Sequence, residues 1–293
     1  MFAIRNKKIY LSIGLILVIA SWACALFFGL KPAIDFSGGS LAEYSFVGER
    51  PLTDDVKNTL TENGYESVSV RVAGEQNLVI RMKEVLPEEQ NTIGALVGEN
   101  AVLERFNTVG PLAGQSLFKK VIIAIVFSVI IIMFFVMIAF RKVSEPVPSS
   151  RYAFATILAL IHDISIPVGV FALLGYFFGM EVDLLFVTAM LAVLGYSVND
   201  TIVVFDRIRE NLLEGMRRDE NFEKLVGRSL EETLARSINT SLTLIFTLIV
   251  LFFVSNETVR TFVLALLIGI TAGTYSSIFL ASPLLVMFGG KKK

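Results

Sequence analysis

Six long apolar stretches dominate the pattern of hydrophobic and polar positions along the chain. They cover residues 9–29, 121–140, 152–178, 182–205, 237–254 and 262–288. A membrane core about 30 Å thick requires about 20 apolar residues of helix, at about 1.5 Å per residue. The pattern therefore predicts six transmembrane helices.

The first stretch also has features of a cleaved signal peptide, because basic residues precede it and Ala23-Cys24-Ala25 resembles a cleavage site. Its apolar run extends to Leu30, however, which is longer than the 7–15 residues typical of a signal peptide. We therefore expect an uncleaved helix.

A different pattern occupies residues 31–117, where apolar and polar residues alternate with a period of two. It predicts strands over 41–47, 67–72, 77–82 and 101–109, and helices over 53–63 and 87–97. The order β-α-β-β-α-β is that of a ferredoxin-like α+β domain. This segment contains no His or Cys, so we expect a binding module rather than a catalytic domain.

Composition supports a polytopic α-helical membrane protein. Hydrophobic residues make up 54% and charged residues 18%, whereas soluble domains carry about 25% charged residues. A net charge of -1 gives no basic field for nucleic acid. The single Cys24 and single His162 exclude an internal disulfide and a multi-histidine metal site. We expect no metal and no cofactor.

Basic residues predict the orientation, because cytoplasmic loops of membrane proteins are enriched in Lys and Arg. The N-terminal segment, the tail and two of the connections are basic: Arg5, Lys7, Lys8, Arg141, Lys142, Arg151, Arg207, Arg209, Arg217, Arg218, Lys224, Arg228, Arg236 and Lys291–Lys293. The two short connections on the other side offer only Arg260. Both termini are thus predicted to be cytoplasmic.

This orientation divides the chain into four parts. Residues 1–30 form the N-terminus and first span, and residues 31–117 form an extracytoplasmic domain. Residues 118–289 form the remaining spans, with a cytoplasmic connector over 206–236 whose apolar face predicts a helix along the interface. Residues 290–293 form a cytoplasmic tail.

Ionisable residues at membrane depth are costly, and each is a functional-site hypothesis. His162 and Asp163 lie roughly 16 Å from the cytoplasmic start of the third span, and Asp200 lies roughly 9 Å deep in the fourth. Arg236 begins the fifth span. The polar residues Asn199, Thr201, Asn239 and Thr240 accompany these groups, the first two as candidates for hydrogen bonds between helices.

A carboxylate that alternates between Arg236 and water would change its proton affinity as it moves, which is what coupling ion passage to conformational change requires. Two other interpretations stay open. Asp200 and Arg236 could form a static buried pair, or Arg236 could extend its charge to the cytoplasmic interface. The His162–Asp163 pair could also serve only to tie helices together.

The fourth span carries a specific motif. The run Gly195–Asn211 (GYSVNDTIVVFDRIREN) closely resembles the fourth-helix signature of the SecF family of bacterial protein-export membrane subunits. Shorter matches are Ile34–Ser40 (IDFSGGS), Val109–Pro111, His162-Asp163 and Leu234–Ser237. The resemblance extends over the whole chain and implies one half of a transporter of the resistance-nodulation-division (RND) type.

The resemblance implies a bacterial cytoplasmic-membrane protein that pairs with SecD beside the SecYEG channel, often with YajC. Such a pair uses the proton gradient, or a sodium gradient in some members, to draw a preprotein outward after the SecA motor has acted. Asp200 matches the family's ion-coupling aspartate and Arg236 its partner arginine. Asp35, Gly38 and Gly39 belong to the family motif of the outer domain.

Three other functions stay open from the residues alone. The chain could be half of an RND-type exporter of small molecules or lipids, although its single small outer domain favours a helper role. Asp163 and Asp200 could act as an intramembrane aspartyl protease, but their local sequences differ from the Tyr-Asp and Gly-x-Gly-Asp of that family. The chain could also be a scaffold whose partner carries the ions.

Overall fold

The computed structural model of the chain describes residues 2–74, 76–98, 100–141, 147–216, 220–255 and 257–289. The chain forms two compact units. The helical unit comprises Met1–Lys31 and Ala124–Lys293, and the outer unit comprises Pro32–Ile123. Several predicted features lie outside the described residues: Lys142, Arg217, Arg218 and the tail 290–293.

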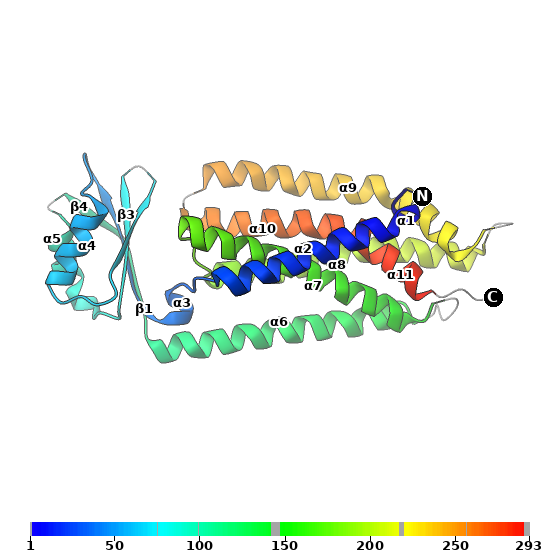
Figure 1. Ribbon diagram of the computed structural model, residues 1–293, viewed down its shortest axis with the longest axis horizontal. Coiled ribbons are helices and arrows are strands. Elements are labelled where there is room, and N and C mark those ends of the chain that lie inside the picture. Colours follow the sequence, from blue (N-terminus) through cyan, green and yellow to red (C-terminus); the bar gives the residue numbers. More distant parts are fainter. Residues whose placement is uncertain are drawn as a thin grey trace. The chain divides into compact units, whose positions relative to one another are not determined.

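The described residues contain six helices that are long and apolar enough to cross a membrane, as predicted. The first five are α2 (Lys7–Phe28), α6 (Pro111–Ala139), α7 (Ser149–Phe178), α8 (Leu184–Glu214) and α9 (Phe222–Val254). The sixth joins α10 (Glu257–Ser276), a π-helical turn η2 (Ser277–Ala281) and α11 (Ser282–Phe288). A short helix α1 (Phe2–Arg5) precedes α2 and lies beside α11, so the described chain begins and ends at the same end of the helical unit (Figure 1).

Three of the spans form the centre of the helical unit. About half of the apolar window of α7, α8 and the sixth span is buried (50%, 56% and 56%), against 11%, 6% and 17% for α2, α6 and α9. Helix α10 packs against α7, α8 and α9, and α2 packs against α7 (Figure 1). Polar side chains on the facing sides of α7, α8 and α10 are therefore shielded from lipid.

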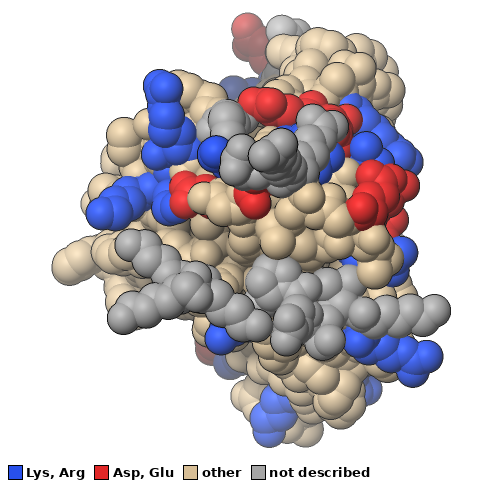
Figure 2. Space-filling view, turned by 90° about the vertical axis from the view of Figure 1, so that its right-hand side faces the viewer, with Lys and Arg blue, Asp and Glu red and all other residues tan. Residues whose placement is uncertain are grey.

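Helix α9 differs from the prediction, which placed a separate connector helix before the fifth span. The structure has one continuous helix from Phe222 to Val254. A polar network joins its first turns to the end of α8: Asn211 donates to Ser229 Oγ (2.8 Å) and accepts from Arg228 Nη1 (3.0 Å). Figure 2 shows basic and acidic side chains gathered at this end of the helical unit.

The outer unit has the predicted ferredoxin-like order. Its elements are α3 (Ile34–Ser37), β1 (Gly39–Phe46), α4 (Thr53–Glu62), β2 (Ser69–Ala73), β3 (Asn77–Met82), η1 (Pro87–Glu89), α5 (Gln90–Val97) and β4 (Ala101–Val109). The antiparallel sheet has the order β2-β3-β1-β4, and Ala42 of β1 lies opposite both Ile80 of β3 and Phe106 of β4. Side chains from the strands and from α4 and α5, including Leu60, Leu78 and Ile93, form its core.

Candidate functional site

Two carboxylates are buried between the central spans. Asp163 of α7 is 0% exposed and Asp200 of α8 is 6% exposed. Their helices pack against each other and against the sixth span. A buried carboxylate is stable only when it is hydrogen-bonded, paired with a charge or protonated, so the partners of each group define what the site can do.

Asp163 is held by three helices. Its Oδ1 lies 2.9 Å from Nδ1 of His162 on the same helix. Its Oδ2 accepts hydrogen bonds from Ser276 Oγ of α10 (2.8 Å) and from Ser197 Oγ of α8. The predicted His162–Asp163 pair therefore exists, and it joins α7, α8 and α10 at one point.

Asp200 has a different partner on the sixth span. Its Oδ2 accepts a hydrogen bond from Ser277 Oγ, the residue that follows Ser276. The neighbouring Thr201 is buried, and its Oγ1 has no hydrogen-bond partner in the described part of the chain. Among the described residues Asp200 thus has one side-chain hydrogen bond, to the sixth span, whereas Asp163 also has partners on α7 and α8.

Both serines lie where the sixth span changes from an α-helix to a π-helix, and Pro283 provides the physical reason. A proline has no N–H for the carbonyl four residues earlier, at Phe279, and its ring crowds that carbonyl. The preceding turn, Ser277–Ala281, widens to the π form. Single π turns occur frequently at functional sites.

Two glycines allow α10 to approach the other central helices closely. A Cβ atom at Gly269 would lie 2.4 Å from Val193 Cγ2. A Cβ atom at Gly273 would lie 3.1 Å from Ser197 Cβ and 3.6 Å from Asp163 Oδ2. Small residues four positions apart are typical of close packing between membrane helices, and both glycines face α8.

The structure does not bring Arg236 to Asp200. Arg236 is exposed, and among the described residues no ion pair joins the two side chains. Asn239 and Thr240 lie on the same exposed side of α9, where Thr240 Oγ1 donates to the backbone oxygen of Arg236 (2.8 Å). The pairing of Asp200 with Arg236 stays a prediction about another conformation.

The helix-bridging role expected of Asn199 and Thr201 is carried by other residues. Asn199 is exposed, and Thr201 Oγ1 has no partner within the described ranges. Ser197, Ser276 and Ser277 make the bridges instead. Sequence reasoning missed them, although Ser197 precedes Asp200 by three positions and the serine pair interrupts an apolar span shortly before Pro283.

Hollows on the described part of the helical unit include two that contain polar side chains. One, of about 430 Å³, is bounded by α2, α7 and α10; His162 lines it together with Leu17, Thr271 and Tyr275. His162 is buried, and its Nε2 has no partner in the described residues. The tautomer of the His162 ring decides whether Nε2 donates or accepts a hydrogen bond.

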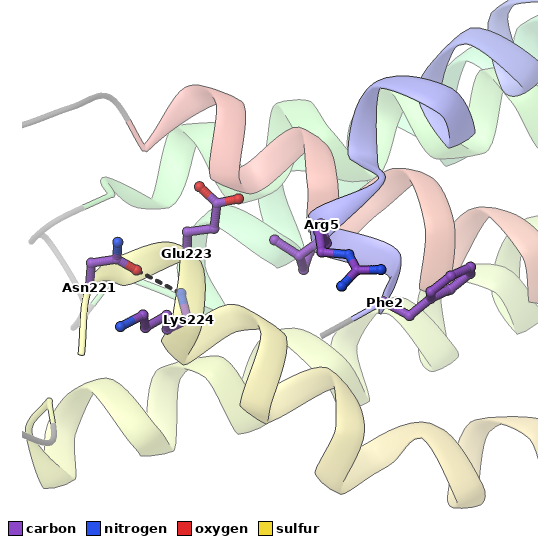
Figure 3. Close-up of a pocket in the computed structure, with 6 residues that line it drawn as sticks. Phe2, Arg5, Asn221, Glu223 and Lys224 are labelled. Atoms are coloured by element: carbon purple, nitrogen blue, oxygen red, sulfur yellow. Dashed lines mark hydrogen bonds between the residues drawn. The ribbon is translucent and has the colours of Figure 1, made fainter. Parts of the chain in front are cut away.

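The second hollow, of about 420 Å³, lies at the end that carries α1, near Phe2, Arg5 and Lys224 (Figure 3). Its Asn221 side chain accepts from the backbone N–H of Lys224 (2.9 Å) and begins α9, and its Glu223 pairs with Lys7 (2.7 Å). Asn221 and Glu223 therefore have contacts that stabilise this end of the fold, and we place the candidate functional site at the buried carboxyl groups. No group of three His, Cys, Asp or Glu residues in the described ranges could hold a metal ion.

The predicted motif of the outer unit has a structural explanation. Gly38 and Gly39 have φ angles of +75° and +119°. A Cβ atom on Gly38 would lie 2.8 Å from Pro111 Cα, and one on Gly39 would lie 2.7 Å from the Met82 oxygen. Asp35 lies in α3 just before them and is half-buried. The glycines are required where the chain enters β1 against the start of α6.

Six candidate spans, two buried carboxyl groups held by serine hydroxyl groups and one small outer unit define a polytopic membrane protein with a polar site among its central helices. Family comparison makes the assignment specific: the family described as "Protein export membrane protein SecD/SecF, C-terminal" matches residues 89–291. The chain belongs to the SecD/SecF family. This membership confirms the predicted role as a membrane-embedded accessory subunit of the protein-export translocase.

Named relatives agree over almost the whole chain. The protein translocase subunit SecF of Thermobaculum terrenum is 42% identical, over 98% of this chain and 94% of that protein. The SecF subunit of Anaerolinea thermophila is 34% identical, over 97% and 92%. The crystal structure of SecDF from Thermus thermophilus, a translocon-associated membrane protein, matches with a TM-score of 0.84 at 28% identity. That match covers 97% of this chain, which spans 38% of the solved SecDF chain.

Proposed function

We propose that this subunit, together with a SecD partner, couples an ion gradient to the late stage of polypeptide export. The observation that carries the proposal is the pair of buried carboxylates, Asp163 and Asp200, both hydrogen-bonded to the same turn of the sixth span. A carboxyl group can take up a proton from one side and release it to the other if its surroundings change. We assign ion coupling to Asp200 and Asp163, and we expect no catalysed reaction of the chain's own.

Arg236 has the role of an alternative partner in this proposal. Its exposed position here corresponds to the state in which Asp200 is bound to Ser277. Movement of α9 against α8 would bring the guanidinium toward Asp200 and favour the ionised carboxylate. In this proposal the ion drives a conformational step in which Asp200 exchanges its partner Ser277 for Arg236.

The orientation and partners follow the same proposal. Both termini and the 206–236 segment face the cytoplasm, on the basis of their Lys and Arg residues. The outer domain, residues 31–117, then contacts the emerging preprotein. The assembly comprises SecD, the SecYEG channel and YajC, and acts after SecA. We propose protons rather than sodium as the coupling ion, on the basis of the family resemblance.

Asp200→Asn tests the proposal, because asparagine keeps the shape and hydrogen bonding but cannot exchange a proton. Export into inverted membrane vesicles is measured with and without an imposed gradient, at matched protein levels. We expect loss of the gradient-stimulated fraction with ATP-driven export intact. The matched control is Asp206→Asn on the same helix, whose exposed side chain pairs with Arg209 (3.1 Å). Full gradient stimulation in Asp200→Asn would refute the assignment.

A further inference from the structure

We propose that Ser276 and Ser277 are positioning residues that convert the protonation state of Asp163 and Asp200 into a hydrogen-bond change at the π-helical turn of the sixth span. The proposal rests on the proposed ion-coupling function and adds the element that responds to the ion. Within the described ranges neither serine hydrogen-bonds to Arg236, so the inference can be tested separately.

The two neighbouring hydroxyl groups contact different aspartates. Adjacent residues of a helix point about 100° apart, and here this divergence directs Ser276 to α7 and Ser277 to α8. Both serines are 0% exposed. One turn of one helix therefore contacts both buried carboxylates, which lie 37 positions apart in the sequence.

Each of the two serine hydroxyl groups has more acceptors nearby than protons to donate. A serine hydroxyl has one proton to donate, yet each of these oxygens lies near two acceptors. Ser276 Oγ is 2.8 Å from Asp163 Oδ2 and 3.1 Å from the Gly273 oxygen. Ser277 Oγ contacts Asp200 Oδ2 and lies 3.2 Å from the Thr274 oxygen.

The protonation state of the carboxyl group determines which of these two acceptors receives the serine proton. An ionised carboxylate can only accept, and it attracts the serine proton because charge-assisted hydrogen bonds are stronger than neutral ones. A protonated carboxyl group donates its own proton to the serine oxygen. The serine proton is then released to the carbonyl three residues earlier. Protonation of the aspartate thus adds a hydrogen bond to the backbone of the sixth span.

The backbone that receives this bond lies directly before a turn that is already irregular. The π turn Ser277–Ala281 has one residue more per hydrogen-bonded loop than an α turn. A change of this turn from the π to the α form would therefore rotate α11, which follows it. Asp163 is also held by Ser197 and His162, whereas in the described part of the chain the Asp200 side chain has a hydrogen bond to Ser277 alone. Removal of the Ser277 hydroxyl should therefore have the larger effect.

The experiment compares Ser277→Ala and Ser276→Ala with Ser282→Ala. Ser282 lies on the same span and is also 0% exposed, but its Oγ has no partner in the described residues. Gradient-stimulated export is measured in vesicles that contain the full translocase, over a series of pH values. A hydrogen bond to a charged group changes an equilibrium by about tenfold or more. We expect Ser277→Ala to reduce the stimulated rate about tenfold and to displace its pH dependence by about one pH unit.

Ser282→Ala should retain the wild-type rate and pH dependence. Ser277→Thr, which keeps the hydroxyl, should restore the pH dependence, a result that a purely structural role does not predict. If Ser277→Ala does not accumulate, the nearly isosteric Ser277→Cys, a weak donor, replaces it. Wild-type rates and pH dependence in both serine variants, while Asp200→Asn is inactive, would overturn this inference alone. Full activity of Asp200→Asn would overturn the proposed function itself.

Discussion

The close packing of α10 against α8 offers a direct test of how the site is held together. Gly269→Ala places a methyl group 2.4 Å from Val193 Cγ2 and 3.0 Å from Val193 Cγ1. Ordinary contacts of a Cβ atom begin at 3.4 Å, so the two helices must separate locally by about 1 Å or the valine must move. Val193 is fully buried, and a valine in a helix has one strongly preferred rotamer. We therefore expect α8 and α10 to separate locally and Val193 to keep its rotamer.

The expected magnitude is the overpacking cost of about 1–3 kcal/mol. Alanine is also a better helix former than glycine by about 0.5–1 kcal/mol, which opposes the overlap. Gly195→Ala on α8 supplies the control, because a Cβ atom there meets nothing within 4 Å. Both variants gain the same helix propensity, so this gain cancels when their free energies of unfolding are subtracted. Gly269→Ala should be less stable than Gly195→Ala by about 1–3 kcal/mol.

The assay is reversible unfolding of the purified chain in mixed micelles, with a double-mutant cycle. Val193→Ala removes both methyl groups that the new Cβ atom would meet. In the double variant the contacts at 2.4 and 3.0 Å are gone and only the 3.2 Å approach to the Cβ atom of residue 193 stays, so the interaction energy of the pair should be favourable by about 1–3 kcal/mol. Gradient-stimulated export should follow the same pattern, since Ser276 and Ser277 lie two turns along the same helix. Additive effects of Gly269→Ala and Val193→Ala would refute the packing argument.

Two further predictions concern other parts of the chain. Gly38→Ala and Gly74→Ala impose the same backbone strain, at φ angles of +75° and +71°. Of these two positions, only Gly38 also faces Pro111 Cα, at 2.8 Å. Hydrogen exchange of β1 in the full chain should therefore show that Gly38→Ala lowers stability by about 1–3 kcal/mol more than Gly74→Ala does. Equal effects would contradict the close contact. Asn211→Ala removes three hydrogen bonds between α8 and α9, two of them to charged groups. The free energy of protection against hydrogen exchange in the first turns of α9 should fall by about 1–3 kcal/mol. Unchanged exchange would refute the role of this network.

Local sequence patterns predicted much of the fold because they act over short distances. Apolar length determines which segments can cross a membrane, and the alternation in residues 31–117 determines which faces of the strands are buried. The fold class, the six spans and the order of the outer unit followed from these patterns. Asp163 and Asp200 were identified in the same way, because a carboxylate inside an apolar run is costly wherever it lies.

What each carboxylate contacts was decided by the tertiary structure. Ser276 and Ser277 lie 113 and 77 positions from their aspartate partners, and no local pattern predicts which helix each will face. That depends on the height and rotation of α10, which are set by Gly269, Gly273 and the π turn before Pro283. The sequence alone determined that this protein places carboxyl groups at membrane depth. The packing of three helices decided that one turn of the sixth span holds both carboxyl groups, because hydrogen bonds form only where packed helices bring donor and acceptor within about 3 Å.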